Sequence, residues 1–266
     1  MPSVHVNDVD IAYDDNNQES DGPPIMLVHG FPLDRRMWEP QIEALSDEFR
    51  IITPDLRGHG ESQVTPGPYT MDLLADDLKG LLDALGIPKV VLGGFSMGGY
   101  VVFSFYRKYP ERVNSLMLLD TRPQPDSEDA QKGREDMAQL AEREGASPIA
   151  ERLIPRLLSP NTVANRQDVV DTVTTMITQC PVEGIAGDLR GMALRGDSSD
   201  LLPKINVPTL IIVGDQDAIT PPAESHSMAA IIPNTKLVEV SDAGHISNLE
   251  NPDEFNHAIH DFLHVH

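Results

Sequence analysis

The sequence has little of what marks secreted, membrane-spanning or disulfide-stabilised proteins. A single cysteine among 266 residues, Cys180, excludes an internal disulfide and is compatible with a reducing compartment. No apolar run approaches the roughly 18 residues that span a membrane. Residues 1–10 contain acids rather than the basic and apolar segments of a signal peptide. We therefore expect a soluble, cytoplasmic protein.

Basic residues are also scarce, since 20 Lys and Arg stand against 42 Asp and Glu and give a formal net charge of −22. Such a charge repels phosphate groups, so we expect neither nucleic acid nor a membrane surface as a partner. Two explanations of the acidity stay open. One is a solvated surface that keeps the protein dispersed, and the other is adaptation to salt, because only six basic residues are lysine. We expect a monomer or small homo-oligomer.

Short apolar runs alternate with longer amphipathic stretches, and 40% of the residues are hydrophobic. This alternation is typical of strand–helix units around a largely parallel sheet. Continuous apolar runs at 25–28 and 90–92 predict strands that are buried on both faces. Residues 3–6 and 9–13 predict a hairpin, and the acidic segment 14–21 predicts a loop. Further strands are predicted at 50–53, 113–119, 209–213 and 236–240, and helices at 71–85 and 252–262.

The composition changes between Thr121 and Asp200, where Asp, Glu, Arg and Ser dominate and no segment has the apolar continuity of a buried strand. Helices are predicted there at 127–144, 147–158, 167–180 and 182–195. We therefore divide the chain into a core, formed by residues 1–120 and 201–266, and a helical cap, formed by residues 121–200.

The most informative segment is Gly94-Phe95-Ser96-Met97-Gly98, which has the spacing G-x-S-x-G between a predicted strand and a predicted helix. A serine that attacks a substrate must project from a sharp strand-to-helix turn. Side chains two positions to either side would collide there with the strand and the helix, which explains the glycines. One alternative is a tight turn with no chemical role. The other is a phosphate-binding loop, but the G-x-x-x-x-G-K-[ST] pattern and a nearby lysine are missing.

Four motifs occur in order between predicted strands, across nearly the whole chain. They are His29-Gly-Phe-Pro32, Asp55-Leu-Arg-Gly-His-Gly-Glu-Ser62, the serine turn, and the two late segments that contain Asp217 and His245. With these motifs the chain resembles the α/β-hydrolases, and among them the small bacterial carboxylesterases that group with enol-lactonases and cofactor-free haloperoxidases. The resemblance implies an α/β fold with a mostly parallel, eight-stranded central sheet flanked by helices, and the cap inserted between the sixth and seventh strands.

The resemblance also assigns the groups that would activate the serine. A serine hydroxyl is a poor nucleophile at neutral pH and needs a base that is oriented by an acid. Among nine histidines, His245 lies directly after the last predicted strand, where the family has its catalytic histidine. The family spacing G-x-x-D-x-x-x-P, from Gly214 to Pro221, selects Asp217 as the acid. Asp215 is the competing aspartate, and we expect it to support the turn instead.

A tetrahedral intermediate also needs hydrogen-bond donors for its developing negative charge. In this fold the donors are backbone amides, and the resemblance points to those of Phe31 and Met97. Phe31, Met97 and Trp38 are candidate substrate-binding residues as well, because each carries a bulky apolar side chain near the serine or its oxyanion loop. Core packing is the alternative for Trp38.

Together these assignments predict a serine carboxylesterase that hydrolyses small, short-chain esters through an acyl-enzyme, with no metal or organic cofactor. Its expected partner is a small-molecule ester, uncharged because a compact cap and an apolar entrance favour such substrates and the acidic surface also disfavours anions. Enol-lactone hydrolysis, perhydrolysis and carbon–carbon bond hydrolysis by the same residues stay open, as does a non-catalytic receptor on this fold. Ser96 argues against the dehalogenases and epoxide hydrolases of the fold, which use an aspartate nucleophile.

Two further groups have ordinary interpretations. Cys180 lacks a partner motif and precedes a proline in the cap, so we interpret it as an incidental thiol. His260 and His264 lie one helical turn apart, as in many metal sites, but the sequence places no carboxylate beside them. We therefore interpret these two as surface histidines.

Overall fold

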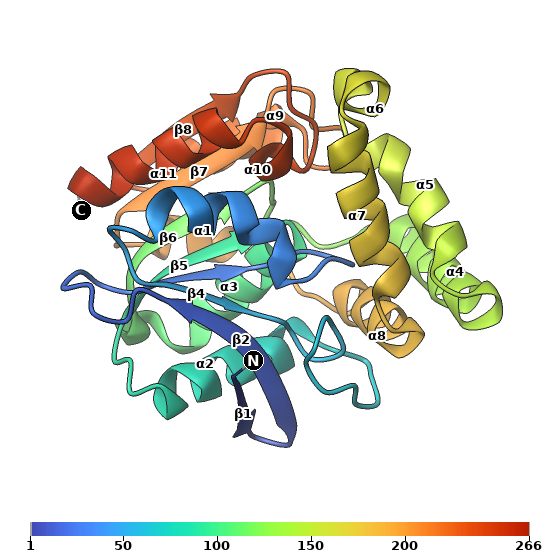
Figure 1. Cartoon of the computed structure of the whole chain (residues 1–266), viewed down its shortest axis with the longest axis horizontal. Helices are drawn as coiled ribbons and strands as arrows, with labels where there is room; N and C mark the ends of the chain where they lie inside the picture. Colours follow the sequence, from blue (N-terminus) through green and yellow to red (C-terminus); the bar gives the residue numbers. More distant parts are fainter. Residues whose placement is uncertain (1, 266) are drawn as a thin grey trace.

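The centre of the molecule is one sheet, in a computed structural model that describes residues 2–265. Its strands are β1 (Ser3–Val6), β2 (Val9–Asn16), β3 (Ile25–Val28), β4 (Ile51–Pro54), β5 (Val90–Phe95), β6 (Val113–Leu119), β7 (Thr209–Gly214) and β8 (Thr235–Val240). Their spatial order is β1-β2-β4-β3-β5-β6-β7-β8 (Figure 1). The β1–β2 and β2–β4 pairs are antiparallel and the others are parallel. The predicted mostly parallel, eight-stranded sheet is confirmed.

Helices cover both faces of the sheet, which explains why its central strands are apolar throughout. Every residue of β3, β5 and β7 is buried, as parallel strands covered on two sides require. The helices outside the cap are α1 (Glu39–Leu45), α2 (Met71–Ala84), α3 (Met97–Lys108), α9 (Pro222–Ala229), α10 (Ser247–Glu250) and α11 (Pro252–Val265). Helices α1 and α11 pack together on one face, and α2 and α3 on the other (Figure 1).

Helix α2 illustrates how the local sequence determines where a helix begins, which face it buries and where it ends. Its first turn is capped by the Thr70 hydroxyl, which accepts a hydrogen bond from the Leu73 amide at 3.2 Å. Its buried residues recur at helical spacing, and the helix ends just before Gly86, whose φ of 67° suits glycine.

Among residues 2–265, which the structure describes, no helix is both long enough and apolar enough to cross a membrane.

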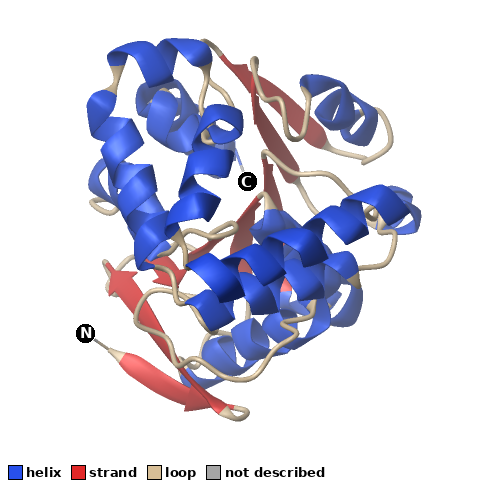
Figure 2. Cartoon of the chain, turned by 90° about the vertical axis from the view of Figure 1, so that its right-hand side faces the viewer, coloured by secondary structure: helices blue, strands red, loops and turns tan. Residues whose placement is uncertain are grey.

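The cap consists of helices that the chain inserts between β6 and β7, as predicted. They are α4 (Glu128–Glu144), α5 (Ser147–Leu157), α6 (Pro160–Asn165), α7 (Gln167–Gln179) and α8 (Val182–Ala193). Helix α4 packs on α8, and α5 packs on α7, to form one group of helices beside the sheet (Figure 2). Of these five cap helices, the sequence analysis predicted all but the short α6. The cap limits at residues 121 and 200 stay a prediction.

The predicted loop over 14–21 begins later than expected, because β2 continues to Asn16 and pairs with β4. Arg50 accounts for this difference. Its guanidinium donates hydrogen bonds to both carboxylate oxygens of Asp15, at 2.9 and 2.8 Å. A bidentate pair of this kind neutralises an acidic strand residue that would otherwise be repelled by its acidic neighbours.

Candidate active site

Ser96 sits in the sharp turn between β5 and α3, with φ 51° and ψ −112°. A non-glycine residue rarely adopts a positive φ, and such a conformation persists only where the surroundings impose it. Here the Ser96 amide donates to the Leu119 carbonyl at 2.9 Å, and the Thr121 hydroxyl donates to the Ser96 carbonyl at 2.8 Å. The neighbouring strand β6 therefore holds the turn on which the serine is displayed.

Two glycines make this turn possible, for the steric reason that the sequence suggests. A Cβ on Gly94 would lie closer than 3.0 Å to the carbonyl of Gly98, on the first turn of α3. A Cβ on Gly98 would lie equally close to the carbonyls of Val28 and His29. Strand β5, strand β3 and helix α3 therefore approach one another at a distance that only glycine allows.

His245 and Asp217 meet at this turn. The Nε2 atom of His245 lies 2.8 Å from the Ser96 hydroxyl oxygen, and its Nδ1 atom lies 2.7 Å from Oδ2 of Asp217. Both side chains are buried. This is the geometry in which an imidazole can take a proton from the serine while a carboxylate fixes its tautomer and stabilises its charged form. The structure thus brings the three residues selected from the sequence into one chain of hydrogen bonds.

The surroundings of Asp217 keep it ionised. Burial by itself would raise the pKa of this carboxyl, but the charge of His245 and hydrogen bonds from His245 and Thr220 hold it below its ordinary value. The Thr220 hydroxyl donates to Oδ2 at 2.6 Å, and the amides of Ile219 and Thr220 donate to Oδ1 at 2.7 and 2.9 Å. Asp215, in contrast, is exposed and accepts from the Ala243 amide at 3.2 Å.

The loop that carries His245 is tied to the cap. The amide of His245 donates to the carbonyl of Leu157, at the end of α5, at 2.9 Å. The buried carboxylate of Glu250 bridges the same two segments, since it accepts from the Gly244 amide at 2.9 Å and from the Ser159 amide at 2.8 Å. The position of the imidazole therefore depends on how the cap is packed.

The loop after β3 is supported by a neutral histidine. His29 is fully buried, and burial together with the nearby His59 lowers its pKa to about 3. Its Nε2 accepts from the Leu56 amide at 2.9 Å, which leaves Nδ1 to donate to the Gly30 carbonyl at 3.0 Å. These bonds fix the loop that contains Phe31, whereas Met97 is the first residue of α3.

A cavity of about 370 Å³ opens above the serine, and we call it the Ser96 cavity. Core residues and cap residues line it together, and several of the cap residues are apolar. Its lining residues are Phe31, Ser96, Tyr100, Arg122, Asp126, Ala130, Gly133, Arg134, Met137, Leu153, Arg156, Leu157, Leu189, Met192, Ile219 and His245. A volume of this size suits a small ligand.

One wall of the Ser96 cavity carries positive charge that the sequence did not reveal. Asp126 is nearly buried and pairs with three guanidiniums: Arg134 at short range, Arg195 at 2.9 Å and Arg122 at 3.6 Å. Arg195 also lies over the ring of Tyr100, 4.1 Å from its centroid. Arg122 and Arg134 line the Ser96 cavity together with Asp126, and Arg156 lines it as well, so the cavity lining carries an excess of positive charge.

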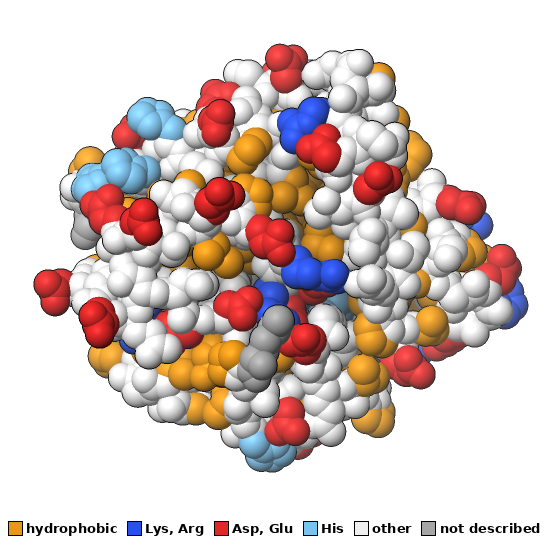
Figure 3. Space-filling view, viewed as in Figure 1, with side chains coloured by type: hydrophobic (Ala, Val, Ile, Leu, Met, Phe, Trp, Pro, Cys, Tyr) orange, Lys and Arg blue, Asp and Glu red, His pale blue; other side chains and the backbone are white. Residues whose placement is uncertain are grey.

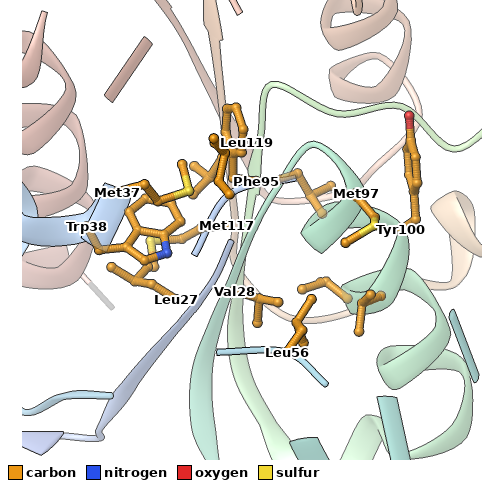
Figure 4. Close-up of a cluster of buried hydrophobic side chains, with 14 of the residues drawn as sticks. Leu27, Val28, Met37, Trp38, Leu56, Phe95, Met97, Tyr100, Met117 and Leu119 are labelled. Carbon is orange, nitrogen blue, oxygen red and sulfur yellow. The ribbon is translucent and has the colours of Figure 1, made fainter. Parts of the chain in front are cut away.

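Two predicted substrate-binding side chains lie elsewhere. Among the described residues that line the Ser96 cavity, Phe31 is present, whereas Met97 and Trp38 are not. Trp38 is fully buried and meets Phe95 edge to face, with ring centroids 6.5 Å apart (Figure 4). Met97 is also fully buried in this hydrophobic cluster (Figure 4). The indole therefore packs in the core, the alternative raised for it, and the Met97 side chain packs in the core as well.

Sequence reasoning also missed a second buried carboxylate, Asp120, at the end of β6. It accepts from the Gly214 amide at 2.9 Å and from the Ser247 hydroxyl at 2.6 Å. Burial and the nearby charge of Asp217 raise its pKa. Its position after a buried strand was the available signal. Asp120, Asp217 and His245 lie close enough together to share a metal ion, but the hydrogen bonds already described account for their arrangement.

Comparison with known proteins agrees with this architecture. A model of the alpha/beta hydrolase fold matches residues 23–147 and 183–252. A thermophilic esterase from Thermogutta terrifontis, solved with malate bound, is 47% identical, covers 100% of this chain and 99% of its own, and has a TM-score of 0.96. The 3-oxoadipate enol-lactonase 2 of Acinetobacter baylyi is 32% identical over 97% of both chains. A putative non-heme chloroperoxidase from Synechocystis sp. is 31% identical over 99% of this chain and 100% of its own. The chain therefore belongs to the alpha/beta hydrolase fold family and resembles its enol-lactonase and haloperoxidase-like members.

Proposed function

We propose that this hydrolase is a serine carboxylesterase that cleaves small esters through an acyl-enzyme intermediate. The observation that carries the proposal is the unbroken series of hydrogen bonds from the Ser96 hydroxyl through His245 to Asp217, with spacings of 2.8 and 2.7 Å. These residues take the roles of nucleophile, base and acid. The strained turn points the hydroxyl into the Ser96 cavity, where a substrate carbonyl can reach it.

The reaction has two steps. His245 takes the hydroxyl proton of Ser96 as its oxygen attacks the ester carbonyl, and the protonated ring then gives that proton to the departing alcohol. Water, deprotonated by the same ring, attacks the acyl-enzyme and releases the acid. The amides of Phe31 and Met97 stabilise the negative oxygen of each tetrahedral intermediate, and loss of one such donor typically costs about a hundred- to a thousand-fold in rate.

The arginines of the Ser96 cavity refine the class of ester. Although the protein carries 42 acidic residues against 20 basic ones, three arginines and a single acid line this cavity. A fixed excess of positive charge in a partly buried site favours a ligand with a negative charge. The malate in the similar Thermogutta esterase is a dicarboxylate. We therefore replace the uncharged ester expected from the surface charge with a small ester that carries a free carboxylate.

A matched pair of substrates tests this choice. We expect an aryl hemiester of glutaric acid to be turned over faster than the corresponding glutaramate, in which a neutral amide replaces the carboxylate. In Arg134→Gln this preference should fall at least severalfold, because one guanidinium is lost from the cavity wall. Arg143→Gln removes the same charge from an exposed part of the same helix and should keep the preference. If Arg134→Gln preferred the hemiester over the glutaramate as strongly as the wild type does, the choice of a carboxylate-bearing ester would be contradicted, but the esterase activity itself would not.

Enol-lactone hydrolysis is the second candidate, supported by the enol-lactonase of Acinetobacter. Perhydrolysis is supported in the same way by the chloroperoxidase-like relative. Both use the same three residues, so the substrate panel must separate them: simple aryl esters across chain lengths, an enol-lactone, and acetate with peroxide, each with Ser96→Ala as the control. If the simple esters were turned over much more slowly than the enol-lactone or than acetate with peroxide, the proposed esterase function would be contradicted. A non-catalytic receptor would turn over none of them.

A further inference from the structure

We propose that Glu48, His260 and His264 form a surface site for a divalent transition metal, with Zn²⁺ as the ion that fits it best. Both histidines lie on α11, one helical turn apart, and Glu48 lies in the segment after α1, close to both. Histidine side chains gather on this edge of the molecule, near the C-terminal end of α11 (Figure 3). None of the three lines the Ser96 cavity, so the site is separate from the proposed esterase chemistry.

The spacing of the three donor groups is the first argument. The two Nε2 atoms are 3.0 Å apart, and the two carboxylate oxygens of Glu48 face one ring each, with Oε1 3.1 Å from Nε2 of His264 and Oε2 3.4 Å from Nε2 of His260. Zinc binds imidazole nitrogen and carboxylate oxygen at about 2.0–2.2 Å with tetrahedral angles, which sets neighbouring ligand atoms about 3.3 Å apart. All three separations are close to that value, so an ion can enter with only small side-chain movements.

Protonation of the rings is the second argument. Two Nε2 atoms at 3.0 Å form a hydrogen bond only if one nitrogen carries a proton and the other does not. If both rings were charged, they would repel each other across this distance. A metal ion removes this repulsion, because both unprotonated nitrogens can then bind the same cation while the glutamate supplies negative charge.

The rings are also held in place. Phe49 meets both imidazoles edge to face, with centroids 6.3 Å from His260 and 5.8 Å from His264. Such contacts limit the rotamers that the histidines sample and so reduce the entropy lost when an ion binds. All three donor side chains are half exposed, which leaves a path for the ion and room for a water molecule as fourth ligand. A bound ion would join α11 to the segment after α1.

Isothermal titration of the full chain tests the site. With ZnCl₂ at pH 7.5 we expect a saturable site that MgCl₂ does not fill, because Mg²⁺ prefers oxygen ligands. His264→Gln and Glu48→Gln should each weaken zinc binding about tenfold or more, since even loss of an outer partner costs that much in known sites. The control is His257→Gln, an exposed histidine of the same helix, which should bind zinc like the wild type.

Thermal unfolding gives a second readout that does not involve activity. Zinc at a hundred times its dissociation constant should raise Tm by about 5 °C or more in the wild type but not in His264→Gln. Absence of saturable zinc binding, or equal binding by the wild type and His264→Gln, would overturn the proposal.

Discussion

Ser96 holds a backbone conformation that a serine seldom adopts, and its neighbours rather than its own preference keep it there. A residue at φ 51° costs about 1–3 kcal/mol relative to an ordinary one. Hydrogen bonds to Leu119 and from Thr121 offset part of this cost. The strained turn also aims the hydroxyl at His245, so the strain belongs to the proposed mechanism.

At the same scale, the two aspartates after β7 should differ sharply when each loses its charge. Asp217→Asn cannot stabilise the charged imidazole or fix its tautomer, and we expect kcat on an aryl ester to fall about ten thousand-fold. Asp215 is exposed and accepts a hydrogen bond from the Ala243 amide rather than from His245, so Asp215→Asn serves as the matched control and should keep most of the activity. Steady-state kinetics of the two purified variants decides the matter, and the reverse ranking would refute the assignment of the acid.

The sequence predicts some site residues well and others not at all, for a physical reason. Ser96, Asp217 and His245 each follow a strand within a short motif, so local pattern is enough to find them. The cavity arginines come from separate segments, with Arg122 after β6, Arg134 on α4 and Arg156 on α5. They meet only because the cap folds back over the core, and no local pattern encodes that contact.

At the scale of elements, β5, the serine turn and α3 pack closely together and against β3. Helix α3 is buried over most of its length, and its first turn lies against the end of β3. The amphipathic elements were predictable because their apolar periodicity is long. The extent of β2 was not, because Arg50, far along the chain, neutralises its acidic end.

Gly98→Ala tests this close packing. The added methyl group must displace the backbone at the end of β3, and we expect unfolding free energy to fall by about 1–3 kcal/mol, as in other overpacked sites. Gly133→Ala is the control, because nothing lies within 4 Å of a Cβ there and alanine favours a helix interior by up to about 1 kcal/mol. Urea unfolding of both variants measures the effect. An unchanged stability in Gly98→Ala would mean that the elements are less tightly packed than described.

At the scale of the whole molecule, a buried ion pair fastens the cap to the core. His59, in the Arg57–Gly60 turn, lies 3.0 Å from Asp188 on α8, and both side chains are fully buried. Burial would lower the pKa of His59, but the adjacent Cys180 and Asp188 raise it well above the ordinary value. This shift favours the imidazolium form of His59, in a pair that joins the core turn to α8 of the cap.

The pH dependence of stability follows from this shift. Because the folded pKa of His59 is raised, the pair stabilises the protein below the ordinary histidine pKa, and this contribution is lost as pH rises through the folded pKa. His59→Gln leaves the buried carboxylate unpaired and should cost about 3 kcal/mol near pH 6. We expect the Tm difference between wild type and His59→Gln to shrink from pH 6 toward pH 10. The double variant His59→Gln/Asp188→Asn has no charge here and should lack this trend; a pH-independent difference would contradict the account.

The proposed esterase activity requires an activated Ser96, and covalent labelling measures that property directly. After treatment with a fluorophosphonate, intact-mass spectrometry should detect one phosphonyl adduct, which peptide mapping places on Ser96. The adduct should be absent in Ser96→Ala and should form far more slowly in His245→Gln, because the base is missing. A folded wild-type protein that stays unlabelled, or one labelled at the same rate in His245→Gln, would contradict it.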